Sequence, residues 1–364
     1  MTTEAGRLHQ ESIIIDGLNA SHFRDPVILE RLEAGRVTAV HITVAAWHGR
    51  DETIDSIADH LALFEKYAAR VLPVRDVADI YRAKATGRVG AIMGFQGGEP
   101  IEDNLKLLSV YRELGVRIIQ LTYNATNHIG SGYRVAEDNG LSGFGREAVA
   151  EMNRLGILID LSHCGDRTTR EAIELSRRPV SVNHANSRRF FDSSRNKDPE
   201  ALKALAAKGG VVGAIAFAPV LTAHRHATLA DYIGAIDDLV DLLGIDHVGL
   251  GSDFMEEMPL ATAEGALKGF TAEGSSAFFS ARPLDGFASV SEMRNVTAAL
   301  LARGYSDEQV RKIMGSNWLR FYEHSWRPES VREVPVTSGS REPLDPKAVK
   351  TDPFSTVSVP ARQS

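Results

Sequence analysis

Residues 156–163 read GILIDLSH, a nearly continuous apolar run that closes on polar side chains. Such a run is typical of a strand that is buried on both faces of a parallel sheet. Seven further runs have this character, and amphipathic stretches with helical periodicity lie between them. They are SIIIDG (12–17), TAVHITVA (38–45), VGAIMGFQ (89–96), RIIQLTY (117–123), PVSVNHA (179–185), GVVGAIAF (210–217) and HVGLGSDF (247–254).

This alternation of strands and helices predicts an α/β protein with a parallel sheet. An open, doubly wound sheet permits the same alternation, but eight such units favour a (β/α)8 TIM-type barrel. One helix has clear end signals: Asp198 is the expected N-cap, Pro199 the first helical residue and Gly209 the expected C-cap. The helical periodicity covers residues 54–68, 102–114, 145–155, 198–209 and 231–243.

The barrel is expected to form one domain over residues 8–325. Within it, residues 255–289 are rich in Gly, Ala and Ser and predict a long loop over one mouth of the barrel. Two helices are expected after that loop, at 290–304 and 306–323. Residues 326–364 contain many prolines and few large apolar side chains, so we expect a flexible tail or an arm that orders against a partner subunit.

Charge and composition exclude several classes of function. The 364 residues include 41 basic and 48 acidic ones, for a net charge of −7, and no dense Lys/Arg run occurs, which argues against nucleic-acid binding. The apolar runs are too short to span a bilayer and the N-terminus lacks a signal-peptide pattern, so we expect a cytoplasmic protein without a membrane partner. The single cysteine, Cys164, excludes an intramolecular disulfide and a thiolate-rich zinc site.

Polar residues that close the apolar strands are the candidate site residues, because the carboxyl ends of the strands form the reaction face of a βα barrel. His163 and His184 end consecutive strands and should project side by side, as expected of two ligands of a metal such as zinc. Asp253 ends the last strand, where a carboxylate can bind metal, hold a water or exchange a proton. The other members of this set are Asp16, Asn19, His48, Gln96, Tyr123 and Asn124.

Two neighbouring residues are better interpreted as structural. His48 follows Trp47 in the loop after the second predicted strand, and we expect the two side chains to pack together. Cys164 directly follows His163 and should point away from it if the strand continues, which favours a buried thiol over a metal ligand.

Over residues 8–323 the sequence resembles the renal or membrane dipeptidase family, the M19 metallopeptidases of the amidohydrolase-like barrels. The motifs that carry this resemblance are GLSGFGREAVAEMNRLGILIDLSH (140–163), VNHANS (182–187), RN (195–196), KGGVVGAIAF (208–217), HVGLGSDF (247–254) and KIMGSNWLRF (312–321). That family usually binds two zinc ions that share a glutamate, and it hydrolyses dipeptides, including some with a D-residue at the C-terminal position.

The resemblance implies roles for four residues of this chain. His163 and His184 match the two histidines of one zinc ion. Asp253 matches an aspartate that contacts the other zinc and transfers protons. Arg195 matches the arginine that binds the terminal carboxylate of the substrate, for which a planar guanidinium is suited. The family is commonly dimeric, so the resemblance also implies a homodimer.

The other half of the family's metal site does not match. The first strand of the family typically ends DGHND, with a His and an Asp as ligands, and this chain has Leu18 and Ala20 there. Gln96 stands at the position of the shared glutamate, and Tyr123 replaces a histidine of the fourth strand. An uncharged amide is a poor bridge between two cations. We therefore expect one divalent metal, most simply zinc, or in any case fewer than two.

Three hypotheses remain open from the sequence. In the first, one metal on His163 and His184, with Asp253 or Gln96 as further candidate ligands, supports hydrolysis of a dipeptide or similar small amide with a free carboxylate. Asp253 and Tyr123 are then catalytic, and Arg195, Asn19 and Tyr123 contact the substrate. In the second, the enzyme has moved to another reaction on a small nitrogenous metabolite, for example in methylated-amine or betaine catabolism. In the third, it is a binding protein without catalysis.

Overall fold

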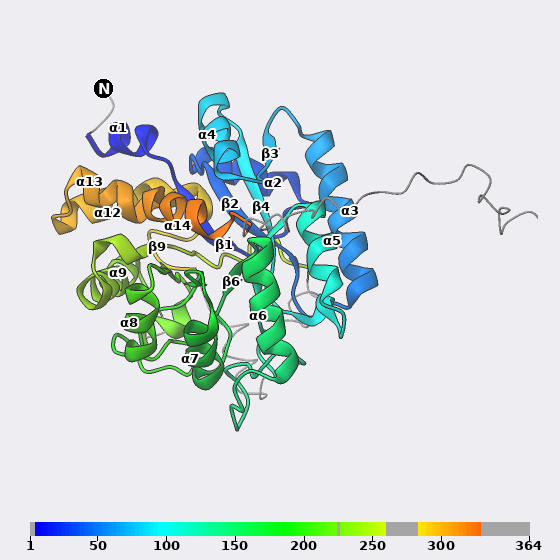
Figure 1. The fold of residues 1–364 in the computed structure, drawn as a ribbon. Coiled ribbons are helices and arrows are strands. Elements are labelled where there is room, and N and C mark those ends of the chain that lie inside the picture. The colour runs from blue at the N-terminus through cyan, green and yellow to red at the C-terminus, as the bar shows by residue number, and fades with distance from the viewer. Residues whose placement is uncertain (1–3, 224–225, 260–282, 329–364) are drawn as a thin grey trace, which may run out of the picture. The chain divides into compact units, whose positions relative to one another are not determined.

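The computed structural model describes residues 4–223, 226–259 and 283–328. Its sheet is parallel throughout and nine-stranded, and all strands except β3 form a ring, which the pairing of β2 with β4 closes. This confirms the (β/α)8 barrel (Figure 1). The strands of the ring are β1 (Ile15–Asn19), β2 (Ala39–Ala45), β4 (Val89–Phe95), β5 (Val116–Gln120), β6 (Leu158–Asp160), β7 (Ser181–Val182), β8 (Val211–Ala214) and β9 (Val248–Leu250).

Strand β3 (Val71–Pro73) was not expected from the sequence. It pairs with the first residues of β4, from Val89 to Ala91, whereas β5 pairs with the last residues of β4, from Met93 to Phe95. β3 is therefore an extra segment at the edge of β4 and takes no place in the ring. Its short apolar run contains Pro73, and a proline within such a run is a signal against a strand, which is why β3 was not expected.

Helices follow the strands and surround the barrel (Figure 1). Asp198 caps α8 as expected, by accepting a hydrogen bond from the Glu200 amide, and Pro199 is the first helical residue. The C-cap of α8 lies one residue earlier than expected: it is Lys208, and Gly209 follows it with φ 84°. The helices between the strands are α2 (Pro26–Ala34), α3 (Arg50–Lys66), α4 (Val77–Thr86), α5 (Lys106–Leu114), α6 (Gly143–Leu155), α7 (Asp166–Leu175), α8 (Pro199–Ala207) and α9 (Leu229–Leu243).

The ends of the described chain pack on the outside of the barrel. Helix α1 (Glu4–Glu11) precedes β1, and α12 (Met293–Arg303), α13 (Asp307–Arg311) and α14 (Asn317–Ser325) follow β9. The two helices expected near the C-terminus are therefore present, the second being divided into α13 and α14 by a wide turn at Lys312–Ser316. A side chain at Gly315 in this turn would collide with the Ile13 carbonyl oxygen, so the close approach to β1 requires glycine.

Trp318 of α14 is fully buried against β1 and β9, where its Nε1 donates a hydrogen bond to the Leu250 carbonyl at 3.0 Å. Any side chain at Gly17 or Gly249 would overlap its indole ring. Trp326 is also buried and stacks on Tyr322 with the ring centroids 4.2 Å apart, so the packed body extends to this residue. The division of the chain into a barrel domain (8–325) and a tail (326–364) stays a prediction in other respects.

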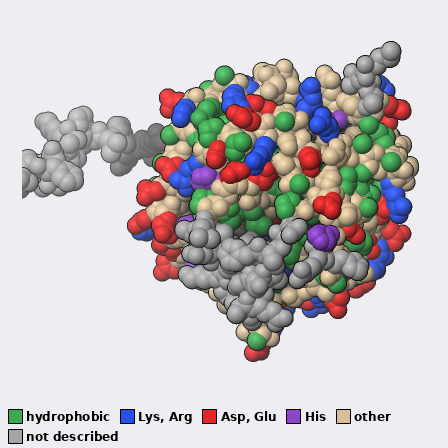
Figure 2. All heavy atoms as spheres, turned by 180° about the vertical axis from the view of Figure 1, so that it is seen from behind, with side chains coloured by type: hydrophobic (Ala, Val, Ile, Leu, Met, Phe, Trp, Pro, Cys, Tyr) green, Lys and Arg blue, Asp and Glu red, His purple; other side chains and the backbone are tan. Residues whose placement is uncertain are grey.

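Parts of the expected loop over the barrel mouth (260–282) and of the expected tail (329–364) lie outside the described residues. Among the helices that are described, none has the length and apolar character needed to cross a membrane. On the face shown in Figure 2, acidic and basic side chains are interspersed, and the described residues form no extended basic area there.

Candidate active site

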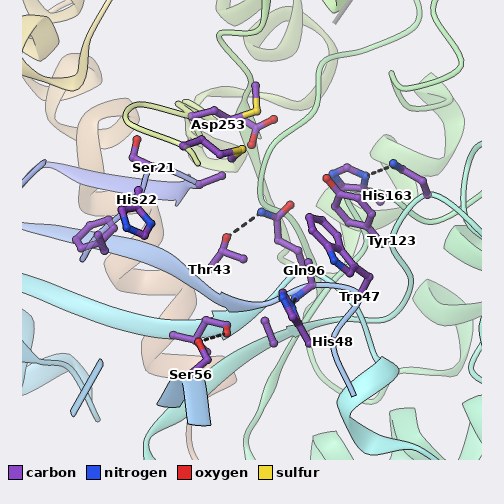
Figure 3. Close-up of a pocket in the computed structure, with 18 of the residues that line it drawn as sticks. Ser21, His22, Thr43, Trp47, His48, Ser56, Gln96, Tyr123, His163 and Asp253 are labelled. Carbon is purple, nitrogen blue, oxygen red and sulfur yellow. Dashed lines mark hydrogen bonds between the residues drawn. The ribbon is translucent and has the colours of Figure 1, made fainter. Parts of the chain in front are cut away.

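The segments that follow the barrel strands border one cavity of about 550 Å³. The carboxyl ends of parallel strands meet at one end of the barrel, so residues far apart in the sequence are brought together there. In Figure 3, Gln96, Tyr123 and His163 lie around the same space as Asp253. The expected site residues in the cavity lining are His48, Gln96, Tyr123, Asn124, His163, Arg195 and Asp253, and Ala20 also borders the cavity.

Leu18, Asn19 and His184 do not line the cavity, and all three are fully buried. Asn19 donates from Nδ2 to the Asp16 carboxylate at 3.3 Å and accepts the Ser21 amide at 3.0 Å. These bonds fix the turn after β1, because an Asn side chain readily bonds the backbone two residues on. The structure therefore does not bring Asn19 to the cavity, where the sequence had placed it as a substrate contact.

The two histidines predicted to be neighbours are in direct contact. The Nε2 atoms of His163 and His184 lie 3.0 Å apart, after the paired strands β6 and β7. His184 is inaccessible to solvent and lies behind His163 as seen from the cavity. Burial, with a further contribution from the Arg195 cation, holds the pKa of both imidazoles well below the usual value. Both rings are therefore neutral at neutral pH and can offer lone pairs.

The Nδ1 atoms of these rings face two different groups. His163 Nδ1 lies 2.9 Å from the Asn124 side-chain oxygen. His184 Nδ1 lies 3.9 Å from the Asp160 Oδ2 atom, and neither of these buried atoms has a hydrogen-bond partner among the described residues. Asp160 is not among the site residues expected from the sequence, although it lies three residues before His163 in ILIDLSH, at the end of the same apolar run.

Asp253 follows β9 in a left-handed backbone conformation with φ 56°, and its amide donates to the Leu18 carbonyl. Its carboxylate makes no hydrogen bond with the described residues and borders the cavity. Burial raises the pKa of Asp253 to about 7; Arg195 opposes this shift and the nearby Asp16 and Asp160 add to it. A carboxyl group with such a pKa exchanges protons readily near neutral pH.

Asp16 fixes the residue that precedes Asp253. Its Oδ1 accepts the Ser252 amide at 2.8 Å and its Oδ2 accepts the Ser252 hydroxyl at 2.5 Å, which ties β1 to the end of β9. Burial raises the pKa of Asp16 to about 6, and the hydrogen bonds from Ser252 oppose that shift. The strand-end residue Asp16 thus supports the site without lining the cavity.

Aromatic rings form one wall of the cavity. The Tyr123 ring stacks on His163 with the centroids 4.3 Å apart, and Trp47 lies 5.4 Å from Tyr123. Tyr133 contacts His163 edge-on at 5.7 Å. Burial raises the pKa of Tyr123, so its phenol keeps its proton and is a hydrogen-bond donor. Trp47 and Tyr133 were not expected in the site, since both lie in loops without periodicity.

Gln96 lies where β4 opens into the cavity. Its Nε2 donates to the Thr43 hydroxyl at 2.8 Å. The amide oxygen points away from Thr43 in Figure 3, so a carbonyl oxygen is the group that Gln96 offers to the cavity. This oxygen is uncharged and is a weaker metal ligand than a carboxylate.

Arg195 is almost fully buried and holds together the two strand ends that carry the histidines. Its guanidinium donates to the Ser162 carbonyl from NH1 and to the His184 carbonyl from NH2, both at 2.8 Å. It also lies over the Tyr133 ring at 5.7 Å. Because guanidinium has five N–H donors, two backbone bonds leave others for an anion in the cavity.

Two interpretations from the sequence are confirmed. His48 stacks on Trp47 with the centroids 5.4 Å apart, although both residues also border the cavity. Cys164 is buried, with only 1% of its surface exposed.

The chemistry of the side chains decides whether a metal ion fits this site. Within the described residues, no group of three or more His, Cys, Asp or Glu side chains is arranged to hold an ion. The Nε2 atoms of His163 and His184 lie 3.0 Å apart, close to the roughly 3.3 Å that separates two nitrogen ligands in a tetrahedral zinc site. Leu18 and Ala20 offer no donor atoms.

The fold and the histidine pair define the class as a metal-dependent hydrolase-type (β/α)8 barrel. Comparison with known proteins identifies the family within this class. The family model described as membrane dipeptidase, peptidase family M19, matches residues 3–265 and 274–328. The dipeptidase tcpJ of Claviceps purpurea (strain 20.1) is 30% identical over 338 residues, which are 88% of this chain and 72% of that protein.

The chain therefore belongs to the membrane dipeptidase family, peptidase family M19. An amidohydrolase of Pseudomonas aeruginosa is 38% identical with a TM-score of 0.85, and the match covers 89% of this chain and 99% of that one. A metallopeptidase of Rhodobacter sphaeroides, solved with a phosphinate mimic of L-Ala-D-Ala, shares the fold at 24% identity and a TM-score of 0.73, over 87% of this chain and 100% of that one. The family implies a dipeptidase-like hydrolase that uses a divalent metal.

Proposed function

We propose that this protein hydrolyses the amide bond of a dipeptide, or of a similar small amide that carries a free carboxylate. The observation that carries the proposal is a single cavity bordered by Arg195, Asp253 and His163. These residues supply a cation for the substrate carboxylate, a base that titrates near neutral pH and one member of the histidine pair. Membership of the dipeptidase family supports the same reaction class.

Arg195 binds the substrate carboxylate through the N–H groups that its backbone bonds leave unused. The guanidinium is nearly buried, so the pair forms in a partly desolvated environment, where charge-assisted hydrogen bonds are strong. Because the same guanidinium is anchored on the carbonyls of Ser162 and His184, the carboxylate is held at a fixed distance from the histidine pair.

Asp253 accepts a proton from the attacking water and returns it to the leaving amine. Its pKa of about 7 suits both steps, because the group is neither a very weak base nor a very weak acid at neutral pH. Tyr123 keeps its phenolic proton and donates a hydrogen bond to the carbonyl oxygen as negative charge develops there. The stack on His163 fixes the plane of the Tyr123 ring.

One divalent ion, most simply zinc, would be held by the Nε2 atoms of His163 and His184. Gln96 and Asp253 are the further candidate ligands, and no second ion is proposed. When bound, such an ion polarises the scissile carbonyl and lowers the pKa of water. We also propose a cytoplasmic homodimer without nucleic-acid or membrane partners, for which sedimentation of the purified protein measures the oligomeric state.

The test is hydrolysis of a panel of L,L- and L,D-dipeptides by the zinc-loaded protein, with C-terminally amidated dipeptides as matched controls. We expect release of free amino acids from the carboxylate forms and little release from the amidated forms. Binding of dipeptides without hydrolysis would instead support a binding protein. Absence of both binding and hydrolysis across the panel would favour a different small nitrogenous substrate and would refute the dipeptidase proposal.

A further inference from the structure

Two guanidinium groups contact the same aromatic ring of the cavity. The Cζ atoms of Arg134 and Arg195 each lie 5.7 Å from the centroid of the Tyr133 ring. All three residues border the cavity. Arg195 is assigned to the carboxylate at the end of the substrate, whereas Arg134 is a cation of the cavity that the proposed reaction does not use.

The backbone that carries Arg134 is fixed at the barrel. The Tyr133 amide donates to the His163 carbonyl at 2.9 Å, and the Arg134 amide donates to the Asn124 carbonyl at 3.1 Å. Asn124 and His163 follow β5 and β6, so these two bonds hold the segment at the carboxyl ends of the strands. A fixed backbone limits the conformational entropy that Arg134 loses when it binds a ligand.

The charged residues of the cavity lining are separated by sign. Among the described residues, the acidic ones are Asp253 and three on α3, which follows β2. Arg24 is paired with one of these, Asp59. Arg134 and Arg195 lie on the segments after β5 and β7, and in the ring β7 stands opposite β2, with three strands between them on either side. The lining therefore has a basic side, which attracts anionic groups of a substrate.

The guanidinium of Arg134 makes a contact that a carboxylate can replace or share. Its Nη1 donates to the Tyr133 hydroxyl at 3.3 Å. The phenol is an uncharged acceptor, and a carboxylate binds guanidinium more strongly because both partners are charged and can form two parallel hydrogen bonds. Ser194, from the same loop as Arg195, adds a hydroxyl group at the cavity.

We propose that Arg134 binds a second carboxylate of the substrate, so that the preferred substrates are dipeptides with aspartate or glutamate as the C-terminal residue. This proposal deepens the proposed function and rests on it for the dipeptide and for its orientation on Arg195. The terminal carboxylate and the side chain of that residue leave the same carbon atom. With the first on Arg195, the second is therefore held near the Tyr133 ring that both arginines contact.

The test compares substrates of nearly equal shape that differ in charge. Ala-Asp is paired with Ala-Asn and Ala-Glu with Ala-Gln, each with an L- and a D-residue at the C-terminal position. In the wild type, kcat/KM should be about 10- to 100-fold higher for the acid than for the amide of each pair, as expected for a hydrogen bond between charged groups. Arg134→Gln should bring this ratio close to one, by a loss that falls mainly on the acids.

A reversal of charge and a matched control make the test specific. Arg134→Glu should disfavour the acids further and should favour Ala-Lys over alanyl-norleucine, which has a side chain of similar length without the charge. Arg24→Gln is the control, because Arg24 also borders the cavity but lies 2.5 Å from the Asp59 carboxylate. Its ratio of acid to amide should equal that of the wild type.

Calorimetric titration of the full chain with the same peptides gives a readout that needs no turnover. Equal values for acid and amide in the wild type, or a ratio that Arg134→Gln leaves unchanged, would overturn the proposal. An equal loss for acids and amides in Arg134→Gln would assign Arg134 to the terminal carboxylate and would overturn it too. If no peptide is hydrolysed but Arg134→Gln abolishes tighter binding of the acids, the proposed function fails and the role of Arg134 stands. Absence of binding for every peptide would refute both.

Discussion

The Nε2 atoms of His163 and His184 lie 3.0 Å apart although the residues are 21 positions apart in the chain. Two neighbouring short strands, β6 and β7, place them there, and the Arg195 guanidinium bonds to the carbonyls of Ser162 and His184 beside them. Leu18 and Ala20, at the end of the first barrel strand, have no side-chain atoms that could bind a metal. The proposed hydrolysis therefore relies on the histidine pair.

The first prediction concerns metal content. Protein loaded with zinc and freed of excess metal should contain one equivalent per chain, because the histidine pair presents two nitrogen atoms to one point and Leu18 and Ala20 offer none. His184→Asn should contain close to none. Elemental analysis of the purified protein measures both values, and two equivalents in the wild type would contradict the argument from Leu18 and Ala20.

The second prediction concerns Asp253. Asp253→Asn should lower kcat/KM on the order of 10²- to 10⁴-fold, since the amide cannot accept the proton from water. Asp55→Asn is the matched control, because Asp55 is an exposed carboxylate that also borders the cavity. Steady-state assays with one dipeptide compare the two variants, and equal rates would remove Asp253 from its proposed role.

The pH profile gives an independent check on the same group. The reaction needs ionised Asp253, and burial raises its pKa to about 7, so kcat/KM should rise with pH and level off above that value. The residual kcat/KM of Asp253→Asn should not show this rise with pH. If kcat/KM of the variant rises with pH at the same midpoint as in the wild type, the titrating group is another residue.

Arg195→Lys should weaken recognition of the substrate carboxylate. Lysine keeps the charge but loses the planar fork, and a hydrogen bond to a charged group is worth about 1.5–3 kcal/mol, so KM should rise on the order of 10- to 100-fold for free dipeptides. KM for amidated dipeptides should not change. Arg188→Lys is the control, since Arg188 pairs with Asp166 and does not border the cavity. A similar loss for both substrates would indicate disruption of the strand ends that Arg195 clamps.

Tyr123→Phe should lower kcat while KM stays nearly constant, because the hydroxyl acts only when charge develops on the carbonyl oxygen. Loss of one such donor costs on the order of 10²- to 10³-fold in rate. The stack of the ring on His163 is retained in the variant. Tyr81→Phe, at an exposed tyrosine, serves as control. An unchanged kcat would leave Tyr123 with a packing role only.

The fifth prediction concerns acid stability. His41 is fully buried; burial lowers its pKa to about 4, while the Gly17 carbonyl, which accepts from Nδ1, opposes the shift. The unfolded chain takes up a proton at this residue near pH 6.5 and the folded chain only near pH 4. The low pKa of His41 therefore adds about 3 kcal/mol to the free energy of unfolding above pH 6.5, and this stabilisation is lost as the pH falls through 4. Urea unfolding of wild type and His41→Gln at pH 7.5 and 4.5 measures it, and His41→Gln should lose less stability.

Local patterns in the sequence were sufficient for the main elements. The eight barrel strands could be predicted because strands buried on both faces leave continuous apolar runs, as in VGAIMGFQ. β3 could not be predicted in this way, because its short run contains Pro73, which argues against a strand. The end of α8 was misplaced by one residue, because Gly209 adopts a positive φ just beyond the cap rather than at it.

The sequence by itself determined the barrel and the residue types at its strand ends, since hydrophobic period and strand termini are properties of short segments. Only the tertiary structure decided which of these side chains meet. It placed Asn19 in a turn, His184 behind His163, and Asp160 opposite a ring nitrogen. It also raised the pKa of Asp253 to about 7, because burial and neighbouring charges depend on residues that are distant in the chain.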